Sequence, residues 1–523
     1  MQDRVNMTAI SPAPADSSNT RDTVAGSGGG GSGVIGGGQP LVFEIGCNGA
    51  SAVSLPASDV APASPSEHIA GHLLCDGGPP LPQVGELDLV RHYTRLAHRV
   101  FSIDGNFYPL GSCTMKYNPR VNERIAALPG FLRVHPYQPE GDVQGILELL
   151  YRLRVWLAEL AGLAEVSLQP AAGAHGEMTG LMMINAYHRS RGQHRTRVLA
   201  PDSAHGTNPA SCTICALDSI KVRSRADGRV DLDDLRAKVD ENTSCLMITN
   251  PNTCGVFDDQ IADIADILHR AGALLYYDGA NMNAALGIIR PGDVGVDVMH
   301  YNTHKTFSTP HGGGGPGAGP VGVTDALRAF LPRPQVVRRD DGTYGWCDDG
   351  PESIGRVRSF YGQTGVLVRA YAYIRALGRD GLLRASKMAV LNANYIAARL
   401  KDRYPIPFPV PCAHEFVTVP QFEKLGITER DFAKRLLDYG IHPPTMSWPI
   451  MHCLMIEPTE TESLRTLDEF CAAMRAIADE AERDPQLLRD APHTLSIGRL
   501  DEVAANRKPV VRWRQQPPVD PKK

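Results

Sequence analysis

Residues 245–277 read CLMITNPNTCGVFDDQIADIADILHRAGALLYY, and this stretch decides the fold. Its first and last segments, Cys245–Thr249 and Ala273–Tyr277, are short apolar runs of the length that buried strands have. Between them, Asp258–Arg270 carries apolar residues at helical spacing and predicts a helix that ends before Gly272. Strands that alternate with helices in this way favour a mostly parallel sheet covered by helices.

Segments on both sides extend this pattern. Arg197–Ala200 is a further apolar strand, and Asp142–Leu163 is a long amphipathic helix. From Glu86 to Leu110 the composition is globular, with helical spacing from Leu87 to Leu96. Helical content rises again through Tyr371–Arg399, whereas Ala413–Ala481 mixes short strands and helices. We therefore expect an α/β protein with a large domain built on a mostly parallel sheet and a smaller C-terminal α+β domain.

The ends of the chain differ from its middle in composition. Residues 1–40 are rich in Ser, Ala, Pro, Asp and Gly, and such a stretch buries too little apolar surface to fold. The expected organisation is a disordered extension at 1–40, an N-terminal arm with helices at 41–140, a large domain at 141–345, a small domain at 346–510 and a tail at 511–523.

Composition and charge exclude several classes of protein. A formal net charge of −5 leaves no basic surface for nucleic acid, and no apolar run is long enough to span a membrane. The 11 cysteines are scattered, which is typical of a protein of the reducing cytoplasm. Cys212 and Cys215 have CxxC spacing, but small apolar neighbours and the lack of a second pair favour core packing over a redox or zinc site. No metal is expected.

Asp278 and Lys305 are the strongest candidates for chemistry. Asp278 ends an apolar strand, where burial penalises an unpaired charge, so it needs a cationic partner. Lys305 lies in the segment 300–308 (HYNTHKTFS), where a desolvated lysine could form a Schiff base. Pyridoxal-phosphate sites use this pair, with the acid on the ring nitrogen. Taken singly, Asp278 could instead cap a helix or bind a metal, and Lys305 could be a solvated loop lysine.

Three further segments could complete a cofactor cradle. The small residues of 171–180 would let a helix start come close to a phosphate, and His175 could stack on the cofactor ring or only cap the helix. Asn250 could bond the cofactor's phenolic oxygen or only form an Asn-Pro turn. The glycine-rich run 311–320 lacks a Walker ending and favours a flexible connection. The candidate cofactor-binding residues are Gly173, Ala174, His175, Asn250, Asp278, Asn281, Thr303 and Lys305, and the candidate catalytic residues are Lys305, Asp278 and His175.

Four strings of sequence are unusually specific. They are Tyr108–Pro119 (YPLGSCTMKYNP), Gln169–Glu177 (QPAAGAHGE), His205–Ser211 (HGTNPAS) and Met455–Glu460 (MIEPTE). Together they closely resemble the glycine-cleavage P-protein family, the decarboxylating glycine dehydrogenases. The likeness runs from about residue 81 to about residue 481. The chain is about half the length of the family's long form and contains the cofactor lysine, so it is similar to subunit 2.

The resemblance implies a fold-type-I, aspartate-aminotransferase-like fold with pyridoxal phosphate as cofactor. It also implies decarboxylation of glycine, transfer of the aminomethyl group to the lipoyl arm of H-protein (EC 1.4.4.2), a cytoplasmic location and a heterotetramer with two copies each of subunits 1 and 2. His205, Thr207 and Asn118 are its candidate contacts for glycine. Another fold-type-I enzyme, such as an aminotransferase or an amino-acid decarboxylase, fits Asp278 and Lys305 equally well. A cofactor-free scaffold is disfavoured because both residues are present.

Overall fold

The computed structural model describes residues 39–46, 49–75, 77, 81–311, 317–409 and 411–512. They belong to two compact units, one of residues 1–99 and 510–523 and the other of residues 100–509. Most of the extension predicted at 1–40 and of the tail predicted at 511–523 lies outside the described residues. The helices of the first unit are α1 (Pro65–His68) and α2 (Glu86–Ala97).

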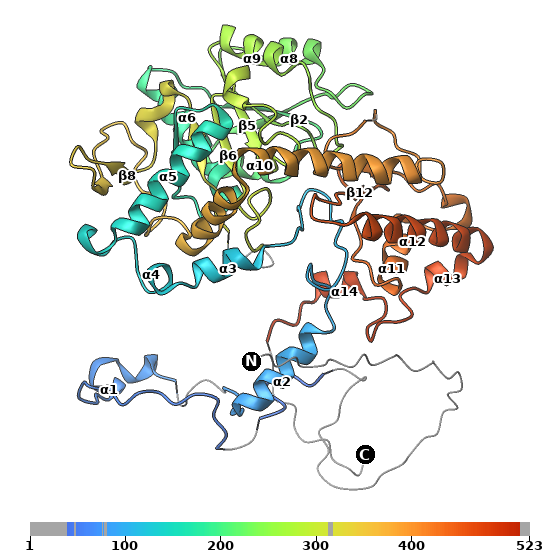
Figure 1. The fold of residues 1–523 in the computed structure, drawn as a ribbon, viewed down its shortest axis with the longest axis horizontal. Helices are drawn as coiled ribbons and strands as arrows, with labels where there is room; N and C mark the ends of the chain where they lie inside the picture. Colours follow the sequence, from blue (N-terminus) through green and yellow to red (C-terminus); the bar gives the residue numbers. More distant parts are fainter. Residues whose placement is uncertain are drawn as a thin grey trace, which may run out of the picture. The chain divides into compact units, whose positions relative to one another are not determined.

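A seven-stranded sheet forms the centre of the second unit (Figure 1). Its strand order is β1-β7-β6-β5-β4-β2-β3, in which β3, β2, β4, β5 and β6 run parallel and β7 is antiparallel to both of its neighbours. The predicted mostly parallel sheet is therefore confirmed. The strands are β1 (Glu165–Ser167), β2 (Arg197–Pro201), β3 (Asp218–Val222), β4 (Thr243–Thr249), β5 (Leu274–Gly279), β6 (Val298–Tyr301) and β7 (Val321–Val323).

Alternation along β5 distributes its side chains between two hydrophobic cores. Leu274 and Tyr276 pack with buried residues of α6 and α7, whereas Leu275 and Tyr277 pack with those of α5, α9 and α10. Successive strand residues point to opposite faces, so Asp278 follows Leu274 and Tyr276 to the α6 and α7 side. These helices are α5 (Gln144–Ala161), α6 (Gly173–Ser190), α7 (Thr207–Ile214), α9 (Ile261–Arg270) and α10 (Thr364–Leu400).

The predicted helices at 142–163 and 258–270 are confirmed as α5 and α9. Helix α5 ends where Gly162 adopts a left-handed conformation (φ 70°), which glycine does at little cost. The helical spacing predicted from Leu87 to Leu96 is confirmed as α2, which ends at Ala97. The remaining helices before the C-terminal region are α3 (Arg120–Ala126), α4 (Pro129–Leu132) and α8 (Leu232–Lys238).

A second core lies in the C-terminal region, which mixes strands and helices as predicted. Its three-stranded sheet has the antiparallel order β10-β12-β11. Helix α10 is broken at Gly378, whose backbone is not helical; its first part buries Leu367 in the large core and its second part buries Ile396 in this one (Figure 1). The predicted domain boundaries stay predictions. The elements are β8 (Gln335–Arg338), β9 (Tyr344–Cys347), β10 (Phe416–Thr418), β11 (Thr445–Met446), β12 (Leu454–Ile456), α11 (Glu429–Asp438), α12 (Leu464–Arg483), α13 (Pro485–Arg489) and α14 (Glu502–Arg507).

Among the helices that the structure describes, none combines the length and apolarity that a membrane crossing requires.

Candidate active site

A cavity of about 400 Å³ opens at the carboxyl ends of the parallel strands. Ligands bind at this edge of open α/β sheets. Its walls come from the ends of β4 and β5, the loop after β6, the starts of α6 and α7, and the segment before β10. The lining includes Ser112, Gly173, Ala174, Glu177, His205, Thr207, Asp278, Asn281, Asn302, His304, Lys305, His414 and Glu415.

Asp278 is buried at the end of β5 and stays ionised. Its Oδ2 accepts a hydrogen bond from Asn208 Nδ2 at 3.3 Å, its Oδ1 accepts one from the Ala280 amide at 3.1 Å, and His300 Nε2 lies 3.4 Å from Oδ1. Burial alone would raise its pKa, but His300, Lys305 and these hydrogen bonds bring the pKa of Asp278 below its ordinary value. The site therefore contains a fixed buried negative charge.

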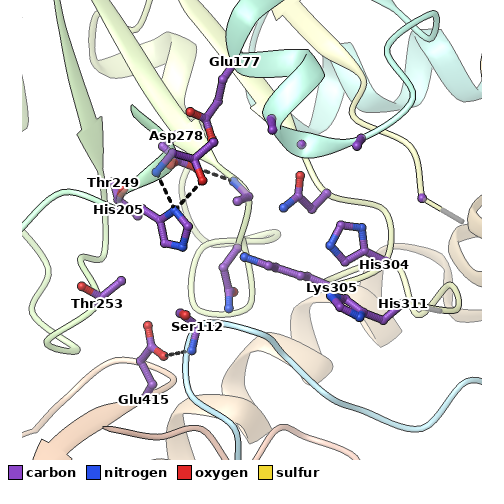
Figure 2. A pocket seen from close by; sticks show the side chains of 18 of the residues that line it. Ser112, Glu177, His205, Thr249, Thr253, Asp278, His304, Lys305, His311 and Glu415 are labelled. Carbon is purple, nitrogen blue, oxygen red and sulfur yellow. Dashed lines mark hydrogen bonds between the residues drawn. The ribbon is translucent and has the colours of Figure 1, made fainter. Parts of the chain in front are cut away.

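Lys305 lies in the loop that follows β6 and lines the same cavity as Asp278 (Figure 2). The backbone of this loop is turned by a hydrogen bond from the Lys305 amide to the Asn302 carbonyl at 3.1 Å. The strand-end acid and the downstream lysine, predicted as a pair from their positions in the sequence, thus line one cavity.

Glu177 is a second acid next to Asp278 in the same wall. Its Oε2 accepts hydrogen bonds from Asn208 Nδ2 at 3.0 Å and Ser211 Oγ at 3.3 Å. Burial, followed by repulsion from Asp278, raises the pKa of Glu177 to about 8. At neutral pH Glu177 is therefore protonated while Asp278 is ionised, and opposite shifts of neighbouring acids are typical of active sites.

This raised pKa predicts a pH dependence of stability. The pKa of Glu177 is about 8 when folded against an ordinary 4.5, so the folded protein keeps a proton that the unfolded chain releases between these values. Stability is then lost as the pH rises through this interval. We expect the melting temperature of the cofactor-free Glu177→Gln variant, relative to wild type, to rise by about 2 °C or more between about pH 5 and about pH 8. A difference that does not change with pH would contradict the assignment.

The start of α6 forms a cradle that fits a phosphate. A Cβ on Gly173 would lie 2.1 Å from Asn302 Oδ1, so only glycine leaves room there. Gly173 and Ala174, in the first turn of α6, line the cavity, and a helix start favours an anion. Asn302 Oδ1 and His304 Nδ1 are buried without a hydrogen-bond partner among the described residues. These features fit a phosphorylated cofactor.

His205 and Thr207 also face the cavity, as predicted for them. Thr207 Oγ1 lies 2.9 Å from His205 Nδ1, and the Thr207 amide donates to the same nitrogen at 3.2 Å. Burial lowers the pKa of His205, so its ring is neutral at physiological pH. Figure 2 shows this ring beside Asp278.

The predicted roles of His175 and Asn250 are not supported. His175 is absent from the cavity lining, and its Nδ1 accepts a hydrogen bond from the Ala171 amide at 3.2 Å, which is the capping alternative. Asn250 is buried outside the cavity lining, and its side-chain amide is bonded to the backbone of Asp258 at 2.8 and 3.1 Å, so it holds the turn. The histidines that line the cavity are His205, His304, His311 and His414.

Thr303, Asn118 and Asn281 also differ from their predicted roles. Thr303 is fully buried, and its Oγ1 donates to the Ala318 carbonyl at 3.3 Å. This hydrogen bond holds the loop, so the hydroxyl is used within the protein and not for a ligand. Asn118 lies outside the cavity lining, in the stretch leading into α3. Asn281 does line the cavity, but its Nδ2 donates to Thr114 Oγ1 at 2.6 Å and to Glu457 at 2.9 Å.

His414 and Glu415 are site residues that the sequence did not reveal. Both line the cavity; His414 Nε2 lies 3.5 Å from Glu415 Oε1, and His414 Nδ1 has no hydrogen-bond partner among the described residues. Although burial lowers it, the neighbouring Glu415 and Glu457 raise the pKa of His414 above its ordinary value. Glu415 accepts a hydrogen bond from the Ser112 amide at 2.7 Å. The only signal was two polar residues directly before the apolar strand β10.

The two cysteines of the CxxC pair pack in or against a hydrophobic core. Cys212 is buried in the core shared with α6, and Cys215 packs against that core. Burial raises the pKa of both thiols, as expected for packing cysteines.

In the glycine run, 312–316 lies outside the described residues, while His311 and Gly317 on either side line the cavity.

Comparisons with known proteins point to one family. Residues 183–315 match the aminotransferase class-V family, and residues 385–493 match the glycine dehydrogenase C-terminal domain family. The probable glycine dehydrogenase (decarboxylating) subunit 2 of Shouchella clausii is 55% identical over 480 residues, which are 91% of this chain and 98% of that protein. Its namesake from Exiguobacterium sibiricum is 55% identical over 485 residues, which are 92% and 98% of the two chains.

Solved structures share the fold at much lower identity. One is the inhibitor-bound glycine decarboxylase (P-protein) of the glycine cleavage system, with a TM-score of 0.67 and 21% identity over 79% of this chain and 94% of that chain. Another is the glutamate decarboxylase of Lactobacillus brevis, with a TM-score of 0.60 and 15% identity over 84% and 98% of the chains. With the class-V match, this likeness confirms the predicted fold-type-I class.

Proposed function

The chain belongs to the family of glycine dehydrogenase (decarboxylating) subunit 2, and on this premise we propose that it decarboxylates glycine with pyridoxal phosphate. The observation that supports this function best is one cavity that holds an ionised buried acid, a lysine and a glycine-lined helix start. When bound, pyridoxal phosphate supplies a covalent anchor for the substrate nitrogen and a ring that accepts the electrons released with carbon dioxide.

The residues around the cavity take distinct roles in this proposal. Lys305 would hold the cofactor covalently and move a proton at its Nζ. Asp278 would keep a proton on the ring nitrogen, since its own pKa is held low. The neutral ring of His205 would lie on the cofactor, and the amides at Gly173 and Ala174 would hold the phosphate.

Further residues orient the substrate and exclude water from it. His205, Thr207 and His414 line the part of the cavity left for glycine. His414 carries a raised pKa, its Nε2 lies 3.5 Å from Glu415 Oε1, and its Nδ1 has no hydrogen-bond partner among the described residues, so it can bind a carboxylate or an acceptor group. Because Glu177 is protonated at neutral pH, a second negative charge does not repel the substrate carboxylate there.

The assembly is also part of the proposal. The name of the relatives, subunit 2, supports a subunit 1 partner, and we propose two copies of each subunit. The aminomethyl group would be transferred to the lipoyl arm of H-protein. We propose a cytoplasmic location, in keeping with free thiols on all ten cysteines that the structure describes.

The test is glycine–bicarbonate carbon exchange by the full chain, purified with subunit 1 and supplied with lipoylated H-protein. We expect exchange that depends on added pyridoxal phosphate and on H-protein. Turnover of another amino acid without H-protein would contradict the proposal and favour an aminotransferase or a different decarboxylase, for which Asp278 and Lys305 are equally suited. If the chain takes up no pyridoxal phosphate, the result would favour the cofactor-free scaffold instead.

A further inference from the structure

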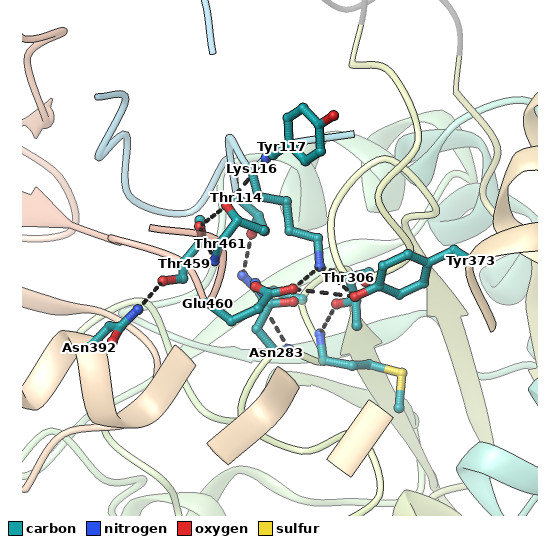
Figure 3. A network of polar contacts seen from close by, with 12 residues as sticks. Thr114, Lys116, Tyr117, Asn283, Thr306, Tyr373, Asn392, Thr459, Glu460 and Thr461 are labelled. Atoms are coloured by element: carbon teal, nitrogen blue, oxygen red, sulfur yellow. Dashed lines mark hydrogen bonds and ion pairs between the residues drawn. The ribbon is translucent and has the colours of Figure 1, made fainter. Parts of the chain in front are cut away.

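Two of the specific strings, 108–119 and 455–460, form a buried polar network beside the cavity (Figure 3). Of their described residues, only Ser112 lines the cavity itself. The strings meet because β12 continues into 455–460, and Leu110 forms a bridge with Ile456. The burial of their polar side chains therefore has an explanation other than direct contact with a ligand.

Lys116 forms the first part of the network. It is 4% exposed, and its Nζ contacts Glu460 Oε1 at 2.5 Å and donates to Tyr373 Oη at 3.2 Å. Burial alone would lower the pKa of Lys116, but Glu460 and Tyr373 raise it, so Lys116 is charged. Its third hydrogen bond goes to the carbonyl of Thr306, the residue after Lys305, at 2.9 Å.

Glu457 forms the second part and is fully buried. It accepts from the Thr114 amide at 3.1 Å, from Thr114 Oγ1 at 2.7 Å, from Asn281 Nδ2 at 2.9 Å and from Asn283 Nδ2 at 3.1 Å. The two asparagines belong to the turn that follows Asp278. This acid therefore holds the backbone next to Asp278, as Lys116 holds the backbone next to Lys305.

Both parts converge on Thr306. While its carbonyl accepts from Lys116, its Oγ1 accepts from the Met282 amide at 2.9 Å, in the turn after Asp278. A buried ion pair is a weak source of stability, because desolvation of its charges offsets their attraction. A network that places two loops at a set separation is a better explanation for the buried charge of Lys116.

We propose that Lys116, Glu457 and Glu460 are positioning residues that set the placement of Lys305 relative to Asp278. The inference rests on the proposed function, in which Lys305 holds the cofactor covalently and Asp278 contacts its ring nitrogen. We call the three residues the clamp. Glu457 fixes the turn after Asp278, and Glu460 fixes the loop of Lys305 through Lys116. A displacement of about 1 Å at a reacting group lowers rates by up to about 100-fold.

The test measures capture of pyridoxal phosphate by the cofactor-free full chain, followed by the visible absorbance of the lysine-bound cofactor. We expect Lys116→Met and Glu460→Gln each to slow capture by roughly 10- to 100-fold. Since both act on the Thr306 carbonyl, the double variant should be no slower than Lys116→Met alone. Tyr373→Phe removes one hydroxyl from the network and should slow capture by about fivefold.

Arg154→Met is the matched control. Arg154 is a buried cation paired with Glu165 in the large core, and it touches neither loop. We expect it to lower the melting temperature and to leave the capture rate within about twofold of wild type. Equal capture rates for Lys116→Met and Arg154→Met at an equal loss of melting temperature would overturn the proposal.

The remaining outcomes are also decisive. If Lys116→Met does not fold, the Tyr373→Phe variant tests the proposal instead. Capture of the cofactor by Tyr373→Phe at the wild-type rate would then overturn the proposal. Additive slowing in the double variant would overturn the shared action on Thr306. If wild type itself captures no cofactor, the proposed function fails, and that result is distinct from a failure of the clamp.

Discussion

Lys305→Ala is expected to lower glycine–bicarbonate exchange by roughly 10⁴-fold or more, because no other lysine lines the described cavity to hold the cofactor. The variant should bind pyridoxal phosphate only reversibly, through the cradle at Gly173 and Ala174. The measurement combines the exchange assay with mass spectrometry after borohydride reduction, which should find the cofactor on Lys305 in wild type and nowhere in the variant.

The control for this variant is Lys387→Ala. Lys387 is exposed on α10, outside the cavity, and its loss should leave exchange within about twofold. A covalent adduct that survives borohydride reduction in Lys305→Ala would place the attachment on another residue and contradict the assignment.

Asp278→Asn is expected to lower exchange by roughly 10³-fold. The substitution keeps the shape of the side chain and removes a buried charge that His300 and Lys305 help to keep ionised. Without it, a proton on the cofactor's ring nitrogen loses its counter-charge. Exchange rates at saturating glycine, with cofactor content measured in parallel, separate this effect from loss of the cofactor.

Glu177→Gln is the matched comparison for Asp278→Asn. It also replaces a buried acid of the same wall by its amide, but at neutral pH Glu177 is already protonated and carries no charge. We expect its exchange rate to fall by less than about tenfold at pH 7. Equal losses in the two variants would show that ionised Asp278 has no special role.

Much of the fold could be predicted because it depends on local patterns. The runs at 245–249 and 273–277 became β4 and β5, since strands buried on both faces are apolar at every position. The positions of Asp278 and Lys305 could also be predicted. The carboxyl ends of parallel strands meet at one edge of the sheet, whatever the rest of the chain does.

The details of the site depend on side-chain direction, which the sequence did not reveal. His175 and His205 lie at the starts of helices in similar small-residue strings, yet only His205 turns toward Asp278. Asn250 was predicted to contact the cofactor, but its side-chain amide bonds the backbone carbonyl and the backbone amide of Asp258, eight residues later. His414 came from a segment distant in the sequence, so only tertiary packing brings it to the cavity.

The clamp has a consequence for how the enzyme is made. Thr114 and Glu457 are separated by 343 positions, so the contact between them forms only after most of the chain has left the ribosome. Until then, the growing chain exposes Lys305 without the residues that place it. Rapid cofactor capture would be a late event in biosynthesis, and a chain interrupted before Glu457 would capture the cofactor slowly. The buried acids of the C-terminal region thereby couple rapid cofactor capture to synthesis of the segment that contains Glu457 and Glu460.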